Sequence, residues 1–464
     1  MKTRKINNIL IIRPDAIGDF VNITPVLKAI KANNPDIKIT LLASKNNSPL
    51  ASNHPLIDET IVDKIKAGQI NSISDFFDYV KEIREKKFDA ALIFYNELPY
   101  ALLAFFARIP FRVGDKDKLL LSPFYNSGVH IKNVDQSKTV IDYNLLYIKC
   151  LGFTYENPAP NLPPPRKDFP IFGNPLIGIH MGYIGGTGAR RKLPKEKYLE
   201  SINQIANLVP GAKIALLGID DMADDADYIT AHSTAGASLI NLVGKTDLDE
   251  LMSVISKLNV YIGVDTGPTH IAAAYKIPMV FIMAIKSVKP LRWAPNHSPK
   301  VIVKLKSRCP HVCNYASCKE TVCSDSISTD EIAEGVKLLL NKKESSYQDE
   351  YRYSFKMSNN ILFVSDQMPR IASKLSQQGF GAAHLPINKF TIFNLKNILD
   401  LMLYEDITIV HSEKNDQILF KLLEWISPSL LLTPPLILFD DRNWGSADEL
   451  IKYYIERFKA KTHV

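Results

Sequence analysis

Asp19 is the residue of this sequence best placed to act as a base. It follows Gly18 in the segment RPDAIGD, directly after the buried-strand pattern Ile9–Arg13 and at the start of a helical pattern. Glycine lets the backbone turn tightly or approach a ligand closely, and a helix N-terminus stabilises a carboxylate. Aspartate is also a common helix cap. We therefore expect Asp19 to be either a general base that faces a cleft or a cap of its helix.

A second motif, rich in glycine and basic residues, runs from His180 to Pro194. Its glycines follow the strand pattern Leu176–His180, a basic triplet comes next, and a helical pattern begins near Pro194. Backbone N–H groups at a helix N-terminus can face a phosphate, while guanidinium and ammonium groups close around it. The spacing is neither G-x-G-x-x-G nor that of a P-loop. The pattern still favours phosphate binding over a solvated basic loop, and the candidate ligands are Gly182, Arg190, Arg191 and Lys192.

The third motif, GVDTGPTHIAAA, joins a strand pattern to a helix of small residues. Proline suits the first turn of a helix, which places the helix start near Pro268. Thr266 and Gly267 could donate hydrogen bonds to a diphosphate, and His270 would point back toward it. The ordinary alternative for His270 is a buried histidine with satisfied hydrogen bonds. Asp-Thr-Gly also occurs in aspartic proteases, but those enzymes pair two carboxylates, whereas Asp265 precedes an alanine-rich helix.

Alternating strand and helix patterns must position these three motifs. Such alternation indicates parallel α/β layers. The strand patterns of the first part are Ile9–Arg13, Ile37–Ala43, Ala90–Phe94 and Gly128–Ile131. The proline-rich stretch Asn157–Pro170 predicts a stiff linker, and a second α/β unit follows it. Because open α/β sheets bind ligands at the carboxyl ends of their strands, we expect the site in a cleft between the two units.

A third segment follows a polar stretch that begins near residue 341. It shows strand patterns at Ile361–Val364, Ile407–Val410 and Leu436–Phe439, with helical patterns between them, which predicts a small flavodoxin-like α/β domain. We therefore divide the chain into residues 1–160, 161–345 and 346–464.

Composition excludes several protein classes. The 464 residues are 46% hydrophobic and 23% charged, which excludes wholesale disorder, collagen and coiled coil. The net charge of +7 fits an anionic partner but does not by itself indicate nucleic-acid binding. The longest apolar run, Leu98–Val113, is interrupted by Arg108 and falls short of the ~18 residues of a spanning helix. The run Ile9–Ile12 is too short for a signal peptide, so we expect a soluble, cytoplasmic protein.

Four of the five cysteines lie close together in the pattern C-x3-C-x4-C-x4-C. In a reducing compartment such a cluster indicates a metal site or free thiols more than disulfides. Structural zinc sites usually have tighter cysteine pairs. Two interpretations stay open, namely free thiols in an ordered loop, or a structural zinc or iron site formed by Cys309, Cys313, Cys318 and Cys323.

Together, the three motifs resemble glycosyltransferase family 9, the bacterial ADP-heptose:lipopolysaccharide heptosyltransferases. They occur in the order and at the separations typical of that family, over roughly residues 6–340. The resemblance implies a GT-B fold, in which two Rossmann-like domains face a cleft. It assigns the acceptor to residues 1–160 and the nucleotide sugar to residues 161–345. It also implies inverting, metal-independent transfer of heptose from ADP-heptose to a hydroxyl of the lipopolysaccharide core.

The resemblance assigns roles to individual residues as well. Asp19 matches the general base, and we assign Arg13 to acceptor binding. The residues expected on the donor side are Gly18, Gly182, Arg190, Arg191, Lys192, Asp265, Thr266, Gly267 and His270. The segment Ala284–Pro290 departs from the family pattern close to the nucleotide.

Three alternatives remain beside this interpretation. The acceptor could be protein Ser/Thr, as in autotransporter heptosyltransferases, which the third segment and the cysteines keep open. The chain could be a non-catalytic nucleotide-sugar-binding scaffold, or a nucleotide-sugar epimerase with the same architecture. We expect no cofactor for catalysis, no nucleic-acid partner, peripheral contact with the inner membrane, and docking or oligomerisation through residues 346–464.

Overall fold

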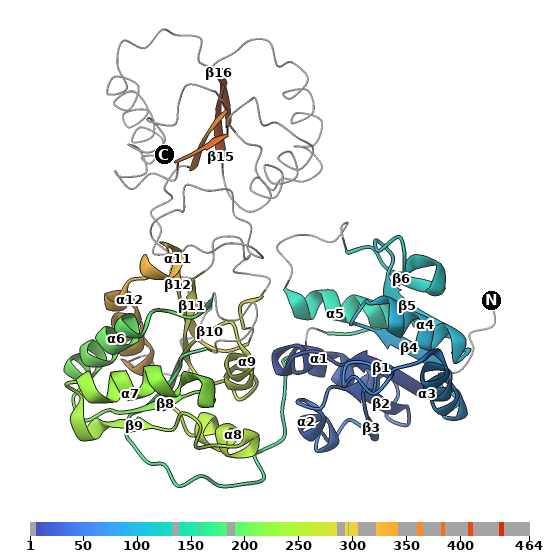
Figure 1. The fold of residues 1–464 in the computed structure, drawn as a ribbon, viewed down its shortest axis with the longest axis horizontal. Coiled ribbons are helices and arrows are strands. Elements are labelled where there is room, and N and C mark those ends of the chain that lie inside the picture. Colours follow the sequence, from blue (N-terminus) through green and yellow to red (C-terminus); the bar gives the residue numbers. More distant parts are fainter. Residues whose placement is uncertain are drawn as a thin grey trace.

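In the part of the chain that the structure describes, the strands form three separate parallel sheets (Figure 1). The computed structural model describes residues 6–131, 139–156, 158–182, 191–284, 293–295, 297–304 and 322–341, together with four strands of the third sheet. The expectation of an α/β protein built on parallel sheets is confirmed. In the described residues, no helix has the length and apolar character needed to cross a membrane.

The first sheet has the strand order β3-β2-β1-β4-β5-β6. Its strands are β1 (Asn8–Arg13), β2 (Lys38–Ala43), β3 (Glu59–Val62), β4 (Ala90–Ile93), β5 (Phe111–Asp115) and β6 (Ser127–Val129). Its helices are α1 (Ile17–Asn33), α2 (Ser48–Ser52), α3 (Ile73–Glu85), α4 (Leu98–Phe106) and α5 (Val140–Lys149). The strand order reverses between β1 and β4, and ligands bind α/β sheets at such a switch point. Asp19 follows β1 and therefore lies at this point.

The second sheet repeats the arrangement with the order β12-β11-β10-β7-β8-β9. Its strands are β7 (Leu176–His180), β8 (Lys213–Leu217), β9 (Leu239–Asn241), β10 (Val260–Val264), β11 (Met279–Met283) and β12 (Lys300–Lys304). Its helices are α6 (Lys195–Leu208), α7 (Ala223–His232), α8 (Leu248–Ser256), α9 (Gly267–Ala274), α11 (Val322–Asp325) and α12 (Thr329–Asn341). Here the order reverses between β7 and β10. These are the two strands that precede the second and third motifs.

The described strands of the third sheet are four, all parallel, in the order β14-β13-β15-β16. They are β13 (Asn360–Val364), β14 (Ala382–Leu385), β15 (Ile407–His411) and β16 (Leu436–Phe439). This order is that of the first four strands of a flavodoxin-like sheet. The helices predicted between these strands lie outside the described residues.

Burial explains why β1 and α1 lie at the centre of the first domain. Ile9–Ile12 are fully buried, as expected for a parallel strand covered on both faces. Most of α1 is buried too, because it contacts α5 on one side and α9 of the second domain on another. In Figure 1, α5 lies above α1 in the first domain, and α9 lies to the left of α1 in the second. One helix thus packs into both halves of the molecule.

The proline-rich linker is attached first to one domain and then to the other. The Asn161 backbone N–H donates to Thr24 Oγ1 on α1 at 3.0 Å. From the second domain, Tyr275 Oη donates to the Pro163 carbonyl at 2.8 Å. Further along, the Phe169 N–H donates to Ser253 Oγ on α8 at 2.9 Å. The point at which the chain passes from one domain to the other therefore lies at residues 161–163.

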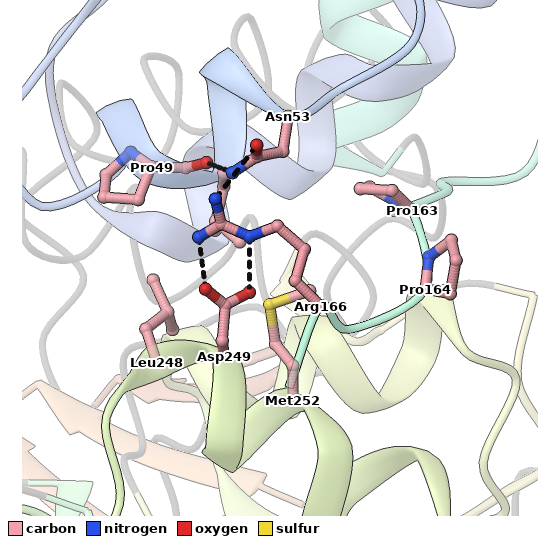
Figure 2. Close-up of a pocket in the computed structure, with 9 residues that line it drawn as sticks. Pro49, Asn53, Pro163, Pro164, Arg166, Leu248, Asp249 and Met252 are labelled. Carbon is pink, nitrogen blue, oxygen red and sulfur yellow. Dashed lines mark hydrogen bonds and ion pairs between the residues drawn. The ribbon is translucent and has the colours of Figure 1, made fainter. Parts of the chain in front are cut away.

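One linker side chain holds both domains at once. Arg166 Nη1 donates to Asn53 Oδ1, just after α2, at 3.1 Å, and its Nε donates to Asp249 Oδ1 on α8 at 3.3 Å. Arg166 Nη2 also forms an ion pair with Asp249. Figure 2 shows this bridge in a small pocket between α2, the linker prolines and α8.

Candidate functional site

The N-termini of α1 and α9 meet across the domain boundary. A Cβ atom on Gly18 would lie 2.7 Å from His270 Cδ2, and one on Gly267 would lie 3.0 Å from Ile17 Cβ. The first distance is shorter than real Cβ contacts, so a methyl group at position 18 would force a neighbour to shift, and the second is at the tight limit of such contacts. Each helix N-terminus presents unpaired N–H groups and the positive end of its dipole. The junction is therefore a favourable place for an anion such as a diphosphate.

Asp19 lies in the first turn of α1, beside a buried guanidinium. The helix begins after Ala16, so Asp19 does not occupy the cap position. Its carboxylate forms an ion pair with Arg13 Nη2. Arg13 is itself fixed, because Nη1 donates to the Phe94 carbonyl at 3.1 Å and the side chain is 8% exposed. The Asp19 side chain is 23% exposed, which leaves room for a substrate hydroxyl to approach.

Asp15 is a second carboxyl group at the same guanidinium. Its Oδ1 lies 3.1 Å from Arg13 Nε. Burial raises the pKa of Asp15 to about 7, the Arg13 charge opposes this rise, and the Asp19 charge adds to it. Sequence reasoning overlooked Asp15. Its position within RPDAIGD, directly after the buried β1, was the available signal.

Asp265 organises the opposite side of the junction. Its Oδ1 lies 3.1 Å from His270 Nε2, and its Oδ2 lies 2.5 Å from Arg191 Nη1. The same Arg191 nitrogen donates to the Asp265 carbonyl at 2.8 Å. Arg191 thus lies beside the strand end that leads into α9. Arg191 of the second motif and Asp265 and His270 of the third are therefore joined by hydrogen bonds.

His270 links this group to the first domain. Its Nδ1 lies 3.5 Å from Asn22 Nδ2 on α1. An amide nitrogen can only donate, so Nδ1 accepts and Nε2 carries the proton that faces Asp265. Asn22 was not found by sequence reasoning, because its role depends on the contact between α1 and α9. His270 is 4% exposed, so both of its nitrogens have partners in a nearly closed space.

His180 is a buried residue that contacts the segments after β7 and β10. Its Nδ1 accepts from the Gly182 N–H at 3.2 Å and lies 3.4 Å from the hydroxyl of Thr266. Burial lowers the pKa of His180 to about 4, so the ring is neutral near pH 7. Gly182 has φ +92°, a conformation that favours glycine. Through these contacts with Gly182 and Thr266, His180 connects the carboxyl ends of β7 and β10.

The remaining predicted residues are placed as follows. Lys192 forms an ion pair with Asp225 of α7, so its ammonium group already has an anionic partner. Arg190 lies outside the described residues, as do Cys309, Cys313 and Cys318, whereas Cys323 lies in α11. Over the ranges that the structure describes, no group of three or more His, Cys, Asp or Glu side chains is arranged to hold a metal ion.

A family model and a curated relative both link this chain to heptosyltransferases. The model of the family "glycosyltransferase family 9 (heptosyltransferase)" matches residues 76–322, more than half of the chain. Lipopolysaccharide heptosyltransferase 2 of Salmonella typhimurium is 26% identical over 295 residues, which are 59% of this chain and 81% of that protein.

Two solved structures share the fold. A family 9 glycosyltransferase from Veillonella parvula superimposes with a TM-score of 0.58 and 19% identity, covering 73% of this chain and 98% of that one. Escherichia coli ADP-heptose lps heptosyltransferase II superimposes with a TM-score of 0.55 and 20% identity. The match covers 72% of this chain and 98% of that one. Each likeness leaves more than a quarter of this chain uncovered.

Proposed function

This chain belongs to glycosyltransferase family 9 and is a transferase, and we propose that it moves heptose from ADP-heptose to a hydroxyl of a lipopolysaccharide core oligosaccharide. The observation that carries the proposal is the convergence of Asp19 with the N-termini of α1 and α9. A base and a site for a diphosphate lie at one junction between two domains. The names of the matched relatives point to the heptosyl donor and to lipopolysaccharide as acceptor.

The proposed reaction is a single displacement with inversion at the anomeric carbon. Asp19 takes the proton of the acceptor hydroxyl while the acceptor oxygen forms the new bond to that carbon. The bond from the same carbon to the diphosphate oxygen breaks, and ADP leaves with both electrons of the bond. General-base assistance of this kind contributes roughly 10²–10⁴ in rate.

The ion pair with Arg13 gives Asp19 a fixed orientation for this step. Because Arg13 is buried and bound to the Phe94 carbonyl, we propose that it positions the base. We also propose that a phosphate of the core oligosaccharide binds at this corner, so that Arg13 takes part in acceptor binding. Asp15 shares the guanidinium and so influences how tightly Arg13 holds Asp19.

Charge on the leaving diphosphate must be compensated as the bond breaks. We propose that the N–H groups at the start of α9, with Thr266 and Gly267, bind the diphosphate. Arg191 lies beside them, 2.5 Å from Asp265 Oδ2. These groups can supply the compensation without a metal ion, and we propose metal-independent transfer on this chemistry.

Each part of the chain has its own role in the proposed function. We propose that residues 1–160 bind the acceptor, that residues 161–345 bind the nucleotide sugar, and that residues 346–464 serve docking or oligomerisation. The names of the curated relatives favour lipopolysaccharide over a protein acceptor. A metal at the cysteine cluster remains a proposal, which elemental analysis of anaerobically purified protein would test.

Asp19→Asn tests the base directly. The change keeps the size of the side chain but removes its basicity, so heptosyl transfer should fall by roughly 10²–10⁴, while the thermal shift produced by ADP stays the same. Asp36→Asn, at an exposed aspartate beyond the other end of α1, is the matched control and should leave transfer unchanged. If D19N transferred heptose at the original rate, Asp19 would not be the base.

A further inference from the structure

Arg13 carries one positive charge between two carboxyl groups. Its Nη2 forms the ion pair with Asp19, its Nε lies 3.1 Å from Asp15 Oδ1, and its Nη1 donates to the Phe94 carbonyl at 3.1 Å. The three charged side chains are mostly enclosed, with exposed fractions of 8% for Arg13, 14% for Asp15 and 23% for Asp19. Because a buried charge is costly unless it is paired, one guanidinium can balance one of the two carboxylates but not both.

The two carboxyl groups contact Arg13 in different ways. Arg13 Nη2 donates a hydrogen bond to Asp19 Oδ1. The contact with Asp15 is an ion pair without a hydrogen bond, since neither Arg13 Nε nor Asp15 Oδ1 has a hydrogen-bond partner among the residues that the structure describes. Buried polar groups normally have such partners, and an ionised carboxylate needs them most. The geometry at Asp19 is therefore typical of a carboxylate, whereas that at Asp15 also suits a neutral acid.

The connection after β2 fixes the backbone that carries Asp15. The Asp15 carbonyl accepts from Ser44 Oγ at 3.1 Å and from Asn47 Nδ2 at 3.3 Å. Asn47 Nδ2 also lies 3.4 Å from the Arg13 carbonyl, and Asn47 is fully buried. Asp15 and Arg13 are thus held by the same asparagine. The charge of Asp15 therefore acts on Arg13 at short range and cannot move away without loss of these hydrogen bonds.

Groups that follow β3 and β4 also lie near Asp15. Lys66, after β3, opposes the rise in the pKa of Asp15, as Arg13 does, while Asp19 adds to it. Lys66 Nζ lies over the Tyr95 ring, 4.3 Å from the ring centre. Burial raises the pKa of Tyr95, after β4, to about 12, so its hydroxyl is neutral. Burial is also the largest influence on Asp15 and brings its pKa to about 7, so that Asp15 changes its charge near neutral pH.

We propose that Asp15 is a positioning residue that sets the strength of the base Asp19 through the guanidinium they share. When Asp15 is ionised, Arg13 is divided between two carboxylates, and Asp19 is the stronger base. When Asp15 is neutral, Arg13 balances Asp19 alone, and Asp19 accepts a proton less readily. The inference rests on the proposed function, in which Asp19 takes the proton of the acceptor hydroxyl. A stronger general base speeds that step, so transfer should accelerate as Asp15 ionises.

Asp15→Asn tests the proposal, because the amide has the size of the carboxyl group and is neutral at every pH. At saturating donor and acceptor, the kcat of the original chain divided by that of D15N should be close to unity at pH 6. The ratio should reach roughly three- to tenfold at pH 8, where only the original chain has the stronger base. Groups that both proteins share cancel in this ratio. A merely structural role of Asp15 would give one ratio at every pH, and that result would overturn the proposal.

Two further variants complete the comparison. Asp36→Asn removes an exposed carboxylate beyond the end of α1, and its ratio should stay close to unity at both pH values. The thermal shift with ADP checks that each variant is folded. If D15N fails this check, Asp15→Ser takes its place, because serine also lacks the carboxyl group. The same rise of the ratio between pH 6 and pH 8 is expected for it.

A titration without donor or acceptor separates this inference from the proposed function. In the full chain labelled with ¹³C at the aspartate carboxyl groups, the NMR signals of Asp15 and Asp19 are those missing from the respective variants. We expect Asp15 to titrate with a midpoint near pH 7, and the Asp19 signal to shift at the same midpoint in the original chain but not in the Asp15 variant. An Asp19 signal that does not respond at that midpoint would contradict the inference, whether or not the chain transfers heptose.

Discussion

At the scale of single residues, His180 shows how burial fixes a protonation state that the loop requires. Its Nδ1 accepts from the Gly182 N–H, a bond that only the unprotonated nitrogen can make. With a folded pKa of about 4 against an ordinary 6.5, the ring binds a proton more readily in the unfolded chain. Its contribution to stability is therefore present above pH 6.5 and is lost as the pH falls toward 4.

We predict that His180→Gln weakens the pH dependence of unfolding of the second domain. Between pH 7 and pH 5 the original chain should lose about 2 kcal/mol through this histidine, as follows from its pKa shift. Urea unfolding at the two pH values measures the difference. His232→Gln, at an exposed histidine of α7, should retain the original dependence. If the free energy of unfolding changed equally between pH 7 and pH 5 in all three proteins, the pKa of His180 would not be shifted by folding.

Sequence reasoning at this scale worked where the chemistry is local. Asp265, Thr266 and Gly267 are adjacent in the chain, so their place at the start of α9 could be anticipated. Asn22 and Asp225 act on residues far away in the sequence, His270 and Lys192, and no spacing rule connects such pairs.

At the scale of secondary-structure elements, the contact between α1 and α9 governs the site. Gly18→Ala would place a methyl group 2.7 Å from the His270 ring, so the ring or the two helices must shift. We expect a loss of roughly 1–3 kcal/mol in stability, as for overpacked cores, and weaker donor binding. Differential scanning calorimetry and an ADP titration measure the two effects.

A second substitution distinguishes this clash from a general defect. His270→Ala removes the ring that the new methyl group would meet. In the double variant Gly18→Ala/His270→Ala, the Gly18 substitution should therefore cost much less stability than it does alone. Additive losses would show that the helices are not held by this contact.

The elements themselves were only partly predictable. β1, β7 and β10 are buried on both faces, and their apolar runs are evident in the sequence. β5 was not identified, because it falls at the end of the apolar run that also contains α4, and a continuous run carries no periodicity. β14 (Ala382–Leu385) was likewise missed, since AAHL lacks the β-branched residues that mark strands.

At the scale of the whole molecule, the relative position of the two domains depends on the linker. Arg166 is the side chain there that binds Asn53 of the first domain and Asp249 of the second (Figure 2). The crossing point at residues 161–163 is three to five residues away in the chain, so the bridge joins the two domains next to their connection.

We predict that Asn53→Ala shifts the molecule toward an open arrangement. The variant loses one hydrogen bond to a charged group, worth about 1 kcal/mol at an exposed position, so donor affinity should fall by up to about fivefold. Small-angle scattering should show a larger radius of gyration without ligand. Lys167→Ala breaks a linker ion pair with Asp247 of the second domain and should not change the radius. Identical scattering of N53A and the original chain would contradict a role for this bridge.

The central claim is heptosyl transfer by this site, and mass spectrometry of an acceptor tests it most directly. The full chain would be incubated with ADP-heptose, EDTA and a lipopolysaccharide core that lacks the terminal heptose. We predict the gain of one heptosyl unit by the acceptor, with release of an equal amount of ADP. An acceptor of unchanged mass, under conditions in which ADP-heptose demonstrably binds, would contradict the claim.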